Sequence, residues 1–135
     1  MGASFMPKIL IIDDDEMIRQ YLSALLERAG FEARAVDGRE ALQVATDDDG
    51  FDAIITDLYM PEVDGIEIVI AVRRTMPDLP IIGITGGRSS ADDPCVVAMT
   101  RLGAAAVLRK PIDRLELLGV LSRVLKTKGG TGVSM

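Results

Sequence analysis

The chain has 135 residues, a formal net charge of −6 and a hydrophobic content of 48%. This length suits one domain with a single core, and no apolar run approaches the roughly 18 residues that a membrane-spanning helix needs. The negative charge argues against direct binding of nucleic acid, whose phosphates repel an acidic surface. A single cysteine cannot form an internal disulfide, and the first residues lack the basic and apolar regions of a secretion signal, so we expect a cytoplasmic protein.

Apolar strand patterns alternate with helical patterns along the chain, which is typical of repeated strand–helix–strand units. Strands are predicted at residues 8–12, 31–36, 52–56 and 81–85 and in the run from residue 104 to Lys110. Helices are predicted around residues 18–26, at 38–46, around 66–73, at 94–102 and at 112–126. The polar segment 47–50 reads as a turn, residues 1–6 as an N-terminal extension and residues 127–135 as a flexible tail or linker.

Short polar residues and glycines predict where two of these helices begin and end. Asp15 is expected to cap the first helix, and Gly30 follows its last apolar position. Asp92 or Asp93 should cap the fourth helix, with Gly103 just after its end.

The predicted strands end in residues that carry charge or a hydroxyl group. Asp13 and Asp14 follow the first strand, Asp57 follows the third, Thr85 ends the fourth and Lys110 ends the fifth. Because parallel strands end at one edge of a sheet, where ligands bind, these side chains are expected to form one site.

The absence of histidine leaves carboxylates to carry the chemistry. Clustered carboxylates without imidazole or thiolate favour Mg²⁺, for which Asp13 and Asp14 are candidate ligands. Asp57 would then attack phosphorus and form a mixed anhydride. The Lys110 ammonium would offset phosphoryl charge, and the Thr85 hydroxyl would donate a hydrogen bond to a phosphoryl oxygen.

From about residue 7 to 126 the chain resembles the receiver domains of bacterial two-component response regulators, of the chemotaxis-regulator type. The segments that carry the resemblance are residues 11–15, 57–61, 85–86 and 110–111. The resemblance implies a flavodoxin-like, doubly wound α/β fold with five parallel strands in the order 2-1-3-4-5. It also implies that the domain catalyses its own phosphorylation and dephosphorylation without being an enzyme in the usual sense.

The same resemblance implies roles for individual residues. Asp57 would accept a phosphoryl group from a histidine kinase or a histidine phosphotransfer protein. Asp14, Asp57 and the backbone carbonyl of Tyr59 would ligate Mg²⁺, and Asp13 would assist through water. Pro111 would follow a cis peptide bond.

The resemblance also implies partners. An effector protein or a fused output domain would receive the signal. Receiver domains of this family pair through the fourth helix, fifth strand and fifth helix, so phosphorylation-dependent homodimerisation is expected.

Two positions depart from the family pattern. Val107 stands where the family usually has an aromatic switch residue, so two outcomes are open: switching runs through Thr85 and the loop 86–93, or the relay is weaker or altered. Tyr59 places a bulky side chain beside the acceptor, where it is expected to influence the lifetime of the phosphoryl group.

Simpler interpretations exist for each residue and for the whole chain. Taken singly, Asp57 is a typical turn or N-cap residue, Cys95 a small apolar helix residue, and Arg73 and Arg74 a solvated helix end. The hypotheses for the chain are a phosphorylation-dependent receiver switch, a phosphorylation-independent interaction module and an aspartyl-phosphate hydrolase. The hydrolase has less support because Asp57, the candidate nucleophile, does not begin an Asp-x-Asp motif and no cap domain is evident.

Overall fold

The computed structural model describes residues 6–47, 50–61, 63–86 and 92–129. Five parallel strands form one sheet in the order β2-β1-β3-β4-β5, which confirms the predicted fold class. The strands are β1 (Lys8–Ile12), β2 (Glu32–Val36), β3 (Ala53–Asp57), β4 (Ile81–Thr85) and β5 (Ala106–Arg109). The helices are α1 (Glu16–Arg28), α2 (Gly38–Thr46), α3 (Gly65–Thr75), α4 (Pro94–Arg101) and α5 (Arg114–Gly129).

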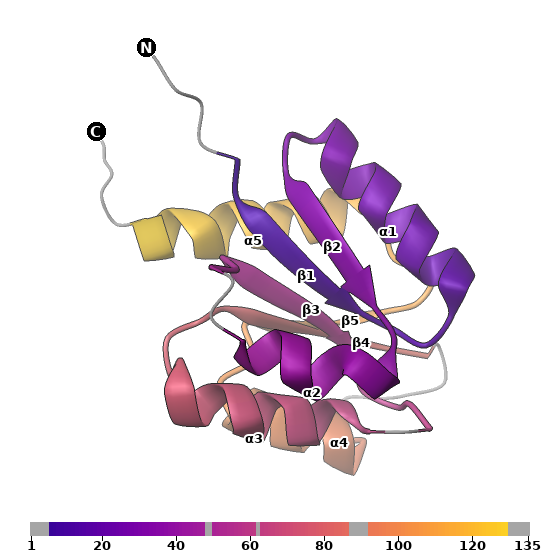
Figure 1. Ribbon diagram of the computed structural model, residues 1–135, viewed down its shortest axis with the longest axis vertical. Coiled ribbons are helices and arrows are strands. Elements are labelled where there is room, and N and C mark those ends of the chain that lie inside the picture. The colour runs from indigo at the N-terminus through magenta and orange to yellow at the C-terminus, as the bar shows by residue number, and fades with distance from the viewer. Residues whose placement is uncertain (1–5, 48–49, 62, 87–91, 130–135) are drawn as a thin grey trace.

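Helices cover both faces of the sheet, with α1 and α5 on one face and α2, α3 and α4 on the other (Figure 1). Every residue of β3 and β4 is buried, which explains their isoleucine-rich sequences. Successive side chains point to opposite faces, so Leu10 and Ile12 pack with α2, α3 and α4 while Ile9 and Ile11 pack with α1 and α5. The sheet therefore divides the core into two packing clusters.

The predicted helix ends are confirmed. The side chain of Asp15 accepts a hydrogen bond from the backbone N–H of Met17 and caps α1. Of the two candidates before Pro94, Asp93 caps α4. Gly30 and Gly103, which follow α1 and α4, have φ angles of +95° and +91°, values that favour glycine.

The last helix differs from its predicted bounds at both ends. It begins at Arg114, two residues late, because the Asp113 side chain accepts a hydrogen bond from the N–H of Glu116 and caps the helix there. It continues to Gly129, although residues 127–129 offer no apolar periodicity. Residues 130–135 of the predicted tail, 1–5 of the predicted extension and 87–91 of the predicted switch loop lie outside the described residues.

The expectation of a solvated helix end is wrong for Arg73. Its guanidinium donates hydrogen bonds to the backbone carbonyls of Leu79, Leu102 and Gly103 at 2.7, 3.1 and 3.2 Å. Arg73 thus joins the C-terminal ends of α3 and α4. Arg74, by contrast, is exposed as expected.

In the part of the chain that the structure describes, no helix has the length and apolar character needed to cross a membrane.

Candidate active site

The C-terminal edge of the sheet brings the predicted site residues together. Asp57 is the last residue of β3 and lies in register with Ile84 of β4. Thr85, the last residue of β4, lies in register with Arg109 of β5, and the next residue is Lys110. The backbone N–H of Lys110 donates to the Thr85 carbonyl at 2.8 Å, which holds the two strand ends together.

The Lys110 ammonium lies between two buried carboxylates. Its Nζ is 2.9 Å from Oδ2 of Asp13 and 3.3 Å from Oδ2 of Asp57. Asp13 is fully buried and Asp57 is 5% exposed. Two carboxylates in so little solvent repel one another strongly, so the lysine is the positive charge that makes the arrangement tolerable.

These charges alter how the site binds protons. Burial, and then the negative charge of Asp13, raise the pKa of Asp57 above its ordinary value of 3.8, while Lys110 opposes the rise. Burial alone would lower the pKa of Lys110, but its contact with Asp13 and the charge of Asp57 raise it. The lysine is therefore cationic at neutral pH.

Asp57→Asn is expected to stabilise the fold at pH 7 by about 0.5–2 kcal/mol. Because the pKa of Asp57 is raised, the folded state binds the proton more tightly than the unfolded state. The charged carboxylate therefore destabilises the fold once the pH rises above the folded-state pKa, and this cost disappears below about pH 4. Urea unfolding of the wild type and the variant in chelator, at pH 7 and pH 4, measures the difference.

Asp14→Asn is the control, because Asp14 is exposed and should change the free energy of unfolding little. A loss of stability in Asp57→Asn at pH 7, or a gain that persists unchanged at pH 4, would contradict this electrostatic account.

Three carboxylates could hold a cation. One oxygen from each of Asp13, Asp14 and Asp57 lies within 4.8 Å of the others. Oδ2 of Asp13 is buried and accepts no hydrogen bond from the described residues, although the Lys110 ammonium offsets its charge. An oxygen in this state, within an all-carboxylate donor set, fits a hard divalent cation such as Mg²⁺.

Tyr59 connects Asp57 to a more distant helix. Its backbone N–H donates to Oδ1 of Asp57 at 3.4 Å, and its hydroxyl donates to Oδ1 of Asp93 at 2.6 Å. The hydrogen bond to Asp93 raises the pKa of Tyr59, so the hydroxyl stays protonated at neutral pH. Sequence reasoning missed Asp93 as a partner, since no local pattern joins residues 34 positions apart.

Two further positions named from the sequence, Val107 and Pro111, lie within and just after β5. Val107 is half-buried and packs against the cluster on the α4 face. A Cβ atom at Gly83 would meet Met99 at 2.8 Å and Val107 at 3.5 Å, so these two side chains occupy the space over Gly83. The Lys110–Pro111 peptide bond is cis.

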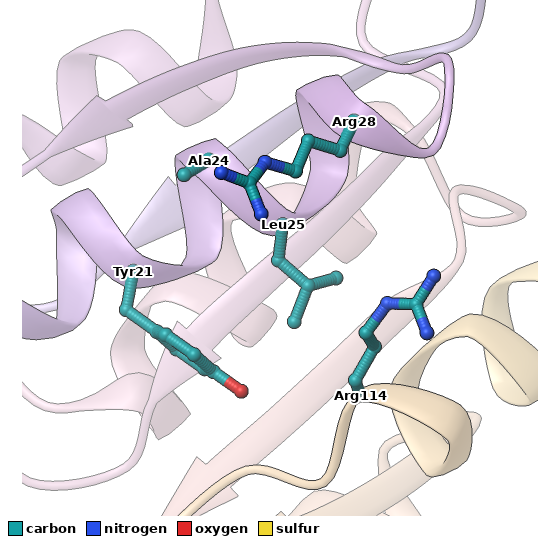
Figure 2. Close-up of a pocket in the computed structure, with 5 residues that line it drawn as sticks. All are labelled: Tyr21, Ala24, Leu25, Arg28 and Arg114. Carbon is teal, nitrogen blue, oxygen red and sulfur yellow. The ribbon is translucent and has the colours of Figure 1, made fainter.

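A separate cavity of about 210 Å³ lies between α1 and α5 (Figure 2). Leu25 points into the space between the two helices, and the guanidinium groups of Arg28 and Arg114 lie on either side of it. Its lining residues are Tyr21, Ala24, Leu25, Arg28 and Arg114. None of the predicted site residues contributes to it.

Comparison with known proteins supports the fold. A family model described as the response regulator receiver domain matches residues 9–122. The chain belongs to the family of response regulator receiver domains.

Relatives of this chain include larger regulatory proteins. The transcriptional regulatory protein PrrA of Mycobacterium tuberculosis is 40% identical over 129 residues, which cover 95% of this chain and 54% of that protein. The C4-dicarboxylate transport transcriptional regulatory protein DctD of Pseudomonas aeruginosa is 34% identical over 121 residues, covering 90% of this chain and 26% of that protein. The chain thus spans about half of the first relative and about a quarter of the second.

Solved receiver structures match over nearly their whole length. The chemotaxis response regulator CheY4 of Vibrio cholerae has a TM-score of 0.78 and 37% identity, covering 89% of this chain and 99% of CheY4. The beryllofluoride-activated NtrC4 receiver domain dimer has a TM-score of 0.80 and 29% identity, covering 90% of this chain and 98% of that one.

Proposed function

We propose that the chain is a phosphorylation-dependent signalling switch in which Asp57 accepts a phosphoryl group from a phosphohistidine on a partner protein. The observation that carries the proposal is the placement of Asp57, buried beside a second carboxylate and 3.3 Å from the Lys110 ammonium. A nucleophilic carboxylate next to a fixed cation suits transfer of a negatively charged group.

In the transfer, an oxygen of Asp57 forms the new bond to phosphorus while the phosphorus–nitrogen bond of the donor breaks. The Lys110 ammonium is close enough to offset the charge of the incoming group. The hydroxyl of Thr85, which ends the neighbouring strand, is proposed to hydrogen-bond a phosphoryl oxygen.

A Mg²⁺ ion fits the donor set described above, with Asp14, Asp57 and the Tyr59 carbonyl as proposed ligands and Asp13 acting through water. When bound, the ion supplies positive charge that reduces repulsion between the carboxylates and the phosphoryl group. We further propose that the domain assists both its own phosphorylation and its dephosphorylation.

The proposed receiver domain covers residues 7–126. Its donor would be a histidine kinase or a histidine phosphotransfer protein, and its output an effector or a fused domain. The names of PrrA and DctD as transcriptional regulatory proteins support a fused output domain and a cytoplasmic location. Nucleic acid would then be bound by that second domain, because this chain carries a charge of −6.

Homodimerisation through α4, β5 and α5 is proposed as one form of output. The solution structure of the activated NtrC4 receiver domain is a dimer, which supports this part of the proposal.

The test is the intact mass of the protein after incubation with acetyl phosphate, with and without Mg²⁺. We expect one phosphoryl group on the wild type in the presence of Mg²⁺, and none on Asp57→Asn. Uptake by Asp57→Asn would show that another residue is the acceptor.

A phosphorylation-independent interaction module is the second candidate, favoured by the aliphatic Val107 on β5. A wild type that remains unmodified over a range of donor and Mg²⁺ concentrations would support this candidate and overturn the first.

A further inference from the structure

A chain of hydrogen bonds runs from Asp57 to the first turn of α4. Asp57 accepts from the backbone N–H of Tyr59, and the Tyr59 hydroxyl donates to Oδ1 of Asp93. The same Oδ1 atom accepts from the backbone N–H of Cys95 at 2.8 Å and so caps α4. One carboxylate oxygen of Asp93 therefore accepts hydrogen bonds from the loop that follows Asp57 and from the first turn of α4.

The first turn of α4 lacks the hydrogen bonds that Arg73 donates at the other end of the helix, to the carbonyls of Leu102 and Gly103. Of the residues Pro94–Arg101, only Met99 is fully buried, and the remaining apolar side chains are partly exposed. The cap formed by Asp93 therefore acts together with the partial packing of Cys95 and Val96 against the core to hold the first turn in place. The short distance of 2.6 Å is typical of a hydroxyl that donates to a charged oxygen.

We propose that the Tyr59–Asp93 hydrogen bond couples the state of Asp57 to the first turn of α4, with Asp93 as the positioning residue. This inference rests on the proposed function, because phosphorylation of Asp57 is the event that is transmitted. Phosphorylation places a group on a carboxylate that Tyr59 contacts directly, so the loop carrying Tyr59 must adjust. The adjustment draws the hydroxyl away from Asp93 and loosens the first turn of α4.

This route does not require an aromatic residue on β5. Val107 is too small to swing between two positions, and Met99 already lies in the space over Gly83. The Tyr59 side chain is 48% exposed and reaches α4 from the acceptor loop itself, so it can move without repacking the core.

Cys95 is one reporter for this movement, although the Tyr59 hydroxyl also contacts its thiol, so alkylation is read together with a second measurement. It is the single cysteine of the chain and lies in the first turn of α4. Alkylation by iodoacetamide therefore labels one position, and one intact-mass spectrum shows both the alkyl group on Cys95 and the phosphoryl group on Asp57. Hydrogen exchange of the α4 amides gives a second readout that does not depend on the surroundings of the thiol.

The experiment compares the wild type with Tyr59→Phe, with and without acetyl phosphate and Mg²⁺. In the wild type we expect phosphorylation to raise the alkylation rate and α4 exchange by about ten- to hundredfold, as expected for loss of one hydrogen bond to a charged group. Tyr59→Phe should show the raised rates before phosphorylation and little further change after it.

Matched variants separate the coupling from general loosening. Tyr21→Phe removes the other tyrosine hydroxyl of the chain, which donates to the Ile112 carbonyl, and should behave as the wild type. Asp93→Asn keeps an acceptor oxygen and should retain the coupling. Asp93→Ser keeps a capping residue but shortens its reach, so it should resemble Tyr59→Phe.

The two proposals fail in different ways. Absence of a phosphoryl group on the wild type would overturn the proposed function, and the coupling with it. The coupling alone would be overturned if the wild type and Tyr59→Phe both take up the phosphoryl group and show the same α4 exchange. That means equally slow exchange before phosphorylation and an equal increase after it.

Discussion

Gly65→Ala is expected to destabilise the protein by about 1–3 kcal/mol, the usual cost of overpacking, and to slow phosphorylation of Asp57. A Cβ atom at this position would lie 2.6 Å from the Asp57 carbonyl oxygen and 3.0 Å from Cα of Leu58. Both are backbone atoms, so the strand end that carries the acceptor would have to move. The N–H of Gly65 also donates to the Leu58 carbonyl at 2.9 Å, which keeps the helix close to that loop.

Urea unfolding and the initial rate of phosphoryl uptake measure the two effects of this change. Gly119→Ala is the control, because Gly119 lies within α5 and a Cβ atom there would meet nothing within 4 Å. That variant should gain about 0.5–1 kcal/mol from the better helix propensity of alanine. Equal gains in both variants would mean that the close approach at Gly65 does not constrain the loop.

Arg73→Met should destabilise the fold by about 2–4 kcal/mol, because hydrogen bonds from a charged donor contribute more than neutral ones. The methionine keeps the aliphatic stem but removes the donors to Leu79, Leu102 and Gly103. The carbonyls of the segment after α3 and of the end of α4 would then depend on water, and the favourable interaction of the cation with both helix dipoles would be lost.

The neighbouring residue supplies the control for this second prediction. Arg74 is exposed and makes no ion pair with any residue in the described ranges, so Arg74→Met should change the free energy of unfolding by less than about 0.5 kcal/mol. Urea unfolding curves for Arg73→Met and Arg74→Met measure the two free energies of unfolding. Similar midpoints for the two proteins would show that the Arg73 hydrogen bonds contribute nothing net.

The strands and the order of the elements could be predicted because their signals are local. Isoleucine-rich runs such as 81–85 are typical of strands buried on both faces, and β4 is buried throughout. The cap at Asp15, and a cap at Asp92 or Asp93, could be predicted for the same reason, since a cap acts within its own turn; the structure selects Asp93. The order of the strands came from the family resemblance, and the structure confirms it.

The main contacts that sequence reasoning missed join distant segments, whereas the Asp113 cap of α5, which it also missed, is local. Arg73 contacts carbonyls up to 30 positions away, and Tyr59 contacts Asp93 across 34 positions. Neither contact leaves a periodic or compositional signal, because each depends on how α3 and α4 pack on the sheet. The convergence of Asp13, Asp57 and Lys110 was predictable only because parallel strands share an edge.

Because the sheet divides the core into two clusters, the stability of the fold and the chemistry of the outer surface of α4 depend on different residues. In many proteins the same residues must satisfy both requirements. The cluster beneath α1 and α5 contains most of their buried side chains, whereas α4 contributes Met99 to the opposite cluster. Substitutions on the outer surface of α4 should therefore cost little stability. The outer surface of α4, which we propose for partners, can thus diversify while Asp57 and Lys110 remain on the unchanged sheet.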